Sequence, residues 1–86
     1  MEKVIIQFIE KRYKNAVRSE KHRYDAVFHV QKQDHTLCFE IFTDKDTSDV
    51  FLTVVFINEA AEFNIYAWYA PSDERQCRQL FDLLRI

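Results

Sequence analysis

Four segments in the middle of the chain have the side-chain patterns of β-strands, and they come one after another. Tyr24–Gln31, Leu37–Phe42 and Glu62–Tyr69 alternate largely apolar and polar positions with a period of two residues, as a strand with one buried face does. The segment VFLTVVFI at 50–57 is apolar on both faces and rich in β-branched residues, which is typical of a central strand. Because the connections are short, this order predicts a four-stranded antiparallel meander.

Helical spacing flanks the strands on both sides. Between Val4 and Val17 the apolar residues recur mostly on one arc at 100° per residue, which predicts an amphipathic helix. The segment APSDERQ at 70–76 is a helix-start signal, with Ser72 as the expected N-cap. The predicted fold is therefore α+β, in the order α-β-β-β-β-α, with the N- and C-terminal helices packed on one face of the sheet.

Composition narrows the class of protein further. A chain of 86 residues with 48% hydrophobic side chains predicts a single folded domain, residues 1–86. The chain contains no glycine, which excludes a P-loop and a dinucleotide fingerprint and favours longer turns built with Asn and Asp. No segment approaches the roughly 18 apolar residues of a membrane span. We therefore expect a cytoplasmic protein with no membrane partner.

The predicted hairpins place aromatic residues on one sheet face. Directly opposed residues of antiparallel strands share a face. Four-residue loops at 32–35 and 58–61, together with Phe42 opposite Phe51, give all three hairpins the same parity. Away from the helices, Phe42, Phe51 and Trp68 then lie side by side, with Tyr66 in the next row. Such an exposed cluster usually binds a partner, unless sheet twist or the C-terminal segment covers it. The expected partner-binding residues are Phe42, Phe51, Tyr66 and Trp68.

Positive charge gathers at the start of the chain. Residues 1–23 carry seven Lys and Arg against three acids, whereas the remaining 63 residues carry five against eleven. The candidate electrostatic surface consists of Lys11, Lys14, Arg18, Lys21 and Arg23. These residues form either an ordinary solvated helix face, a contact for an acidic protein, or a phosphate-binding patch. The pI of 5.9 and the acids predicted on the sheet face argue against a dedicated nucleic-acid binder.

Candidate catalytic and metal-binding residues are few. The segment DKDTSD at 44–49 resembles the start of a calcium loop but lacks the glycine and the glutamate that such a loop requires. His29 and Cys38 are expected to be cross-strand neighbours, with His35 in the adjoining turn. They make neither a paired zinc-ligand motif nor a nucleophilic pair with a pocket. Cys38 and Cys77 are expected to be free buried thiols. No catalytic residue, metal ligand or cofactor is predicted.

The sequence therefore predicts a small non-enzymatic protein-interaction or regulatory module, such as an inhibitor or adaptor. Its expected partner is a protein, either a second copy that completes a homodimer or a larger protein. A basic N-terminal helix that carries these residues would form a second, electrostatic surface. The alternative function is nucleic-acid association through Lys11–Arg23, and an enzyme using His29 and Cys38 is the third.

Overall fold

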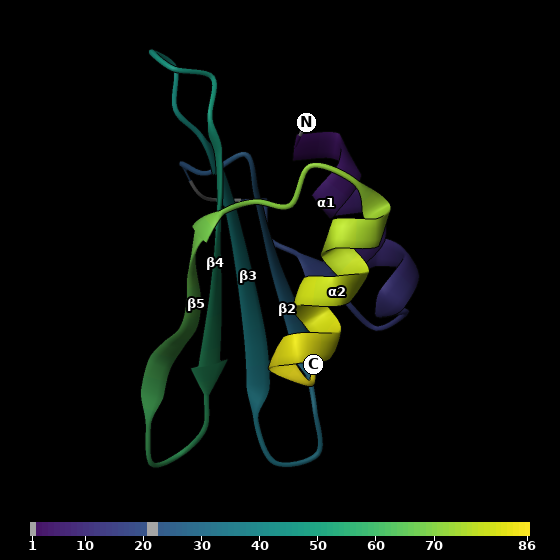
Figure 1. The fold of residues 1–86 in the computed structure, drawn as a ribbon. Coiled ribbons are helices and arrows are strands. Elements are labelled where there is room, and N and C mark those ends of the chain that lie inside the picture. The colour runs from purple at the N-terminus through teal and green to yellow at the C-terminus, as the bar shows by residue number, and fades with distance from the viewer. Residues whose placement is uncertain (1, 21–22) are drawn as a thin grey trace.

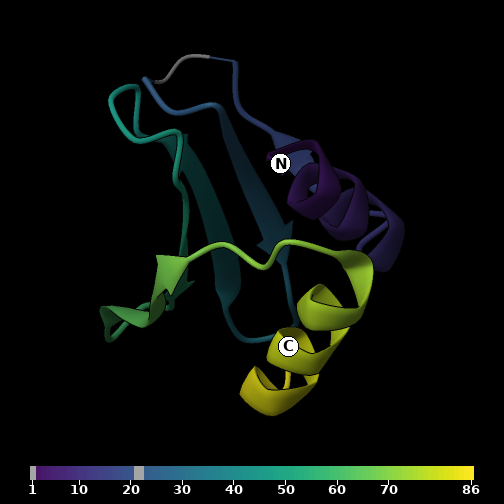
Figure 2. The same cartoon turned by 45° about the horizontal axis from the view of Figure 1, so that its top comes forward.

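The predicted strands are present, and each pairs with its neighbour in the sequence. The computed structural model describes residues 2–20 and 23–86. Its elements are α1 (Glu2–Arg12), β1 (Val17–Arg18), β2 (Ala26–Gln31), β3 (Thr36–Thr43), β4 (Val50–Ile57), β5 (Glu62–Tyr69) and α2 (Glu74–Leu84). The strands form an antiparallel sheet in the order β1-β2-β3-β4-β5. Both helices lie on one side of this sheet (Figures 1 and 2), which confirms the α+β prediction.

The first helix is shorter than its apolar spacing predicts. It ends at Arg12, and the chain then turns, with the Ala16 amide donating to the Tyr13 carbonyl at 3.2 Å. The Asn15 side chain donates to the carbonyl of Gln31 at 3.0 Å, which ties this turn to the end of β2. Residues 17–18 therefore extend the sheet instead of the helix. The predicted helix up to Val17 is wrong in its last turn, and the sheet has five strands instead of four.

The core lies between the two helices and the middle of the sheet. Phe39 of β3 and Phe81 of α2 are fully buried, and their rings stack 5.4 Å apart. Phe8 of α1 meets the Phe81 ring edge-on at 5.0 Å, and Tyr13 packs on Phe39 at 5.6 Å. One aromatic cluster thus fixes both helices on the same sheet face. Among the described residues, no helix is long and apolar enough to span a membrane.

Polar side chains shape the turns in place of glycine. The Asp44 carboxylate accepts hydrogen bonds from the amides of residues 46 and 47, at 2.8 and 3.2 Å. The Asn58 side-chain carbonyl accepts from the Ala61 amide at 2.7 Å. Ser48 takes a left-handed backbone with φ 64°. The expectation of turns built with Asn and Asp is confirmed at both positions.

The second helix begins one residue later than predicted. Asp73, not Ser72, is the N-cap, and its carboxylate accepts from the Gln76 amide at 2.8 Å. The Ser72 hydroxyl instead donates to the Gln76 side chain at 2.8 Å. The helix ends at Leu84, and the C-cap Arg85 takes a left-handed backbone (φ 59°) and donates its amide to the carbonyl of Asp82.

The hairpin register agrees with the prediction except in β5. Gln31 opposes Thr36 and Phe42 opposes Phe51, as predicted. The β4–β5 pairing also begins as predicted, with Ile57 opposite Glu62 and Val55 opposite Asn64. An extra residue, Ile65, then forms a β-bulge.

Beyond the bulge every pair is shifted by one residue. Val54 opposes Tyr66, Leu52 opposes Trp68 and Phe51 opposes Tyr69. The predicted pairs Thr53–Tyr66 and Phe51–Trp68 are therefore wrong. The bulge allows two consecutive residues, Ile65 and Tyr66, to pack against the core, which strict alternation does not permit.

Candidate protein-interaction surface

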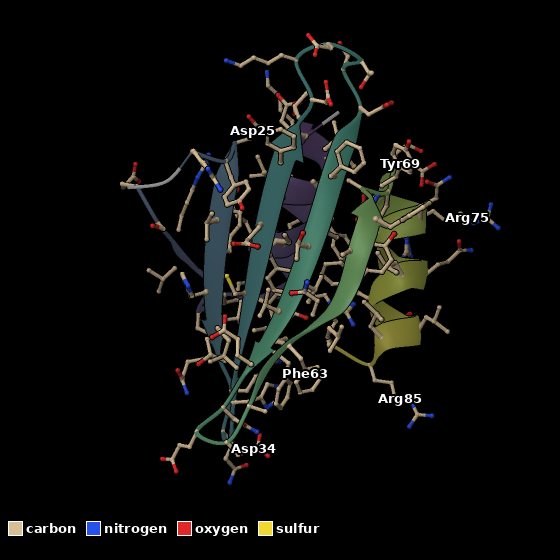
Figure 3. The ribbon with its side chains drawn as sticks, turned by 90° about the vertical axis from the view of Figure 1, so that its left-hand side faces the viewer. Asp25, Asp34, Phe63, Tyr69, Arg75 and Arg85 are labelled. Atoms are coloured by element: carbon tan, nitrogen blue, oxygen red, sulfur yellow. The ribbon has the colours of Figure 1, made fainter. Side chains whose placement is uncertain are left out.

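Five aromatic rings form a row, and four of them lie on the open face, which is the sheet face turned away from α1 and α2. We name this row the aromatic belt; its members are Tyr24, Phe42, Phe51, Tyr69 and Trp68. Successive ring centroids are 6.3, 6.5, 4.9 and 5.6 Å apart in that order. Figure 3 shows the open face, with Asp25 and Tyr69 on either side of the end where the belt lies.

The belt turns around the edge of the sheet at its last ring. Trp68 opposes Leu52, so it lies on the helix side of β5, whereas Tyr69 opposes Phe51 on the open face. The two adjacent rings meet at an angle of 90°. Both are largely exposed, because 66% of Trp68 and 48% of Tyr69 are accessible to solvent. Phe42 is 42% exposed, whereas Phe51 and Tyr24 are half-buried.

The predicted placement of these residues on the sheet is correct in part, and their binding of a partner stays a prediction. Phe42 and Phe51 lie side by side on the open face, as predicted. Trp68 was expected beside them and lies on the other side of β5. Tyr66 is not part of the belt; it is half-buried against the core, and its hydroxyl donates to the Tyr69 carbonyl at 2.9 Å.

Two belt residues were missed by sequence reasoning. Tyr69 reaches the open face only because of the bulge. Tyr24 was expected on the helix-side face by alternation with Ala26, but it precedes β2 and packs against the open-face residues. Tyr24 is close to Phe42 across the hairpin, but strict alternation along the segment assigns the two residues to opposite faces of the sheet.

A small apolar cluster on the open face packs against Tyr24, the first ring of the belt. Val27, Cys38 and Val55 on the open face are buried, although neither helix covers them. Tyr24 and Ile57 pack against this cluster. Tyr24 is therefore held by packed side chains and has little freedom to lose when a partner binds.

The thiols lie outside any reactive arrangement. Cys38 and Cys77 are free and buried, as predicted. Burial raises the pKa of the Cys38 thiol to about 11, and the carboxylate of Glu40 adds to this effect. His29 does oppose Cys38 in the register, as predicted. A thiol with so high a pKa is a weak nucleophile near neutral pH. Across residues 2–20 and 23–86, no three His, Cys, Asp or Glu side chains are placed to hold a metal ion.

Charged groups border the belt. The Arg23 guanidinium lies over the Tyr24 ring, 6.0 Å from its centroid, and both line a hollow of about 370 Å³ together with Phe42. The Asp25 carboxylate lies on the helix side of the sheet, where it accepts from the hydroxyl of Thr43, the residue opposite the buried Val50. The loop at 44–49, which joins the strands of Phe42 and Phe51, carries three further aspartates and one lysine.

The basic residues do not form one helical surface. Lys11 is in α1, Arg18 is in β1, and Lys14 and Arg23 are in the connecting segments, while Lys21 lies outside the described residues. The Arg18 guanidinium lies 5.7 Å from the centroid of the Phe28 ring and donates to the Asp25 carbonyl at 3.3 Å. The prediction of a single basic helix over this segment is therefore wrong.

No protein-family model, curated protein sequence or solved structure matches the chain. The belt and the charges that surround it are therefore the features that bear on function.

Proposed function

We propose that the protein is a small interaction module and that the aromatic belt is the surface on which a partner protein docks. The exposure of its rings carries this proposal. At roughly 200 Å² for each fully exposed aromatic side chain, Phe42, Tyr69 and Trp68 together leave about 310 Å² accessible. Contiguous apolar patches of this size are often functional.

The composition of the belt supports a protein partner. Aromatic residues are enriched in the buried centres of protein interfaces, where single side chains contribute much of the binding energy. A standard interface buries about 800 Å² on each partner, so the three exposed rings would supply about two fifths of one side. In this proposal the module acts by covering or bridging its partner, as an inhibitor or adaptor does.

Nucleic-acid association through the basic residues has less support. Arg18 and Arg23 already contact rings of this chain, and the loop beside the belt carries three aspartates against one lysine. Stacking surfaces for single strands need basic residues beside the aromatic ones.

Site-specific photocrosslinking in the producing cells tests the proposal. A benzophenone amino acid at position 42 replaces an exposed ring with another ring, so the fold should be retained. The matched control carries the same group at Gln33, which is exposed in the β2–β3 turn. We expect a defined protein adduct from position 42 that Phe51→Asp removes, and no such adduct from position 33. Equal adducts from both positions, or none from position 42, would refute the proposal.

A further inference from the structure

The open face is acidic as well as aromatic. Glu40 opposes Val27 and Thr53 in the middle of the face, and Glu62 opposes Ile57 at its far end. The loop at 44–49 adds three carboxylates above the belt. Arg23 and Lys45 are the basic residues that accompany these five acids among the described residues of the face and loop. A partner must therefore meet negative charge around the rings.

This charge argues against a second copy of the chain on the belt. Two copies facing each other through their belts would place the same carboxylates opposite one another, and like charges across an interface are unfavourable. In a twofold arrangement, Arg23 and Lys45 of a second copy would offset only part of this repulsion, and Lys3 and Lys11 would offset none, because they are on α1, on the other side of the sheet. A foreign partner fits the surface better.

Cation–π contacts place Arg and Lys side chains over aromatic rings elsewhere in the protein. Arg12 lies over Phe8 and Phe81, at 5.8 and 5.7 Å from the centroids, and Lys32 lies 4.8 Å from the centroid of Tyr13. Arg23 lies over the first ring of the belt, Tyr24. Within the part of the chain that the structure describes, no Lys or Arg lies over the other four belt rings.

We propose that the partner presents a basic and apolar segment, with arginine or lysine next to large apolar side chains; this inference rests on the proposed function of the belt. An apolar side chain fits the hollow of about 370 Å³ lined by Arg23, Tyr24 and Phe42. A neighbouring cation lies over the exposed ring of Tyr69 or Trp68. Asp46 and Asp49 attract the same cation from the loop, and this charge complementarity sets the orientation of the segment.

The binding of a labelled octapeptide of alternating arginine and leucine, followed by fluorescence anisotropy, tests this inference. Asp46→Asn/Asp49→Asn removes two charges while keeping the side-chain shapes. The matched control, Glu10→Gln/Glu59→Gln, removes two exposed charges on α1 and on the β4–β5 turn. At the strength of surface ion pairs, we expect the aspartate variant to bind about threefold to tenfold more weakly and the control less than twofold. Tyr69→Ser should weaken binding in the same way.

A glutamine–leucine octapeptide separates this inference from the proposed function. If it binds as tightly as the arginine peptide, or if neither peptide binds at millimolar concentration, the basic partner is refuted. If position 42 still forms adducts in that case, the belt remains an interface. If it forms none, the proposed function is refuted as well. Sedimentation equilibrium tests the remaining occupant: a dimer that Tyr69→Asp dissociates would place a second copy on the belt and overturn the inference.

Discussion

The energetic coupling between Phe51 and its neighbours across β4 and β5 tests the arrangement of the belt directly. The register places Phe51 opposite Tyr69, and the two rings stack 4.9 Å apart with an interplanar angle of 27°. Trp68 opposes Leu52 on the other side of the strand. A double-mutant cycle with alanine at positions 51 and 69 should therefore measure an interaction that the cycle at positions 51 and 68 lacks.

The magnitude follows from the geometry of the rings. Aromatic pairs contribute about 0.5–1.5 kcal/mol beyond the area that they bury. Because Phe51 is half-buried and Tyr69 is 48% exposed, we expect a coupling of about 0.5–1 kcal/mol, in the lower part of that range. For Phe51 and Trp68, which share no ring contact, additivity within about 0.3–0.5 kcal/mol is expected.

Urea unfolding followed by far-UV circular dichroism is the appropriate assay, since Trp68 is replaced in one of the cycles and its fluorescence cannot report on all variants. The four proteins of each cycle should share one m-value, which verifies that each variant still unfolds in a single transition. A coupling between Phe51 and Trp68 that exceeds the coupling between Phe51 and Tyr69 would show regular pairing without a bulge. That result would refute the belt as described.

Two further predictions concern the core and the thiols. Phe81→Ala should lower the free energy of unfolding by about 3–5 kcal/mol, because the ring is fully buried between Phe8 and Phe39, whereas Leu83→Ala, at a side chain that is 80% exposed, should change it by no more than about 0.5 kcal/mol. Similar thermal shifts for the two variants would place the core elsewhere. Burial raises the pKa of both thiols from 9.0 to about 11. Since the unfolded thiols ionise first, the stability that they contribute is present below pH 9 and is lost as the pH rises towards 11. The urea midpoint should fall more between pH 7 and pH 10 in the native protein than in Cys38→Ala/Cys77→Ala. An equal fall in both proteins would contradict buried thiols.

Local patterns in the sequence were sufficient for the centre of the sheet. The apolar run at 50–57 could only be a central strand, and the loops at 32–35 and 58–61 set the parity of the hairpins on either side of β3 and β4. Phe42 and Phe51 could therefore be placed together on the open face. These positions depend on alternation over short distances along the chain, which the sequence displays directly.

The end of α1 depends on contacts that the sequence does not display. Tyr13 and Ala16 continue the helical spacing of apolar residues, but they are apolar because they pack against the core after the chain has turned. Asn15 holds that turn through the distant carbonyl of Gln31. Periodicity alone cannot distinguish a last helical turn from a packed loop with the same spacing.

The residues around the bulge give no sequence signal of its presence. From Ile65 to Tyr69 the chain carries no charged side chain, so no residue marks which face is solvated once strict alternation is abandoned. An extra residue at this position is therefore compatible with the sequence in either register. The packing of Ile65 and Tyr66 against the core decides between the two.

The same bulge determines how β5 can meet a partner. β5 is an edge strand of the sheet. Exposed edge strands pair readily with other chains unless a bulge or a backbone group that is already hydrogen-bonded interferes. The Ala70 amide donates to the Val50 carbonyl at 2.7 Å, so alternation directs the Tyr69 carbonyl away from β4, and there the Tyr66 hydroxyl binds it. The bulge interrupts the remaining edge groups in the middle of the strand. β5 therefore presents side chains more readily than backbone, and Trp68 and Tyr69 are the side chains that it exposes most at the end where the belt lies.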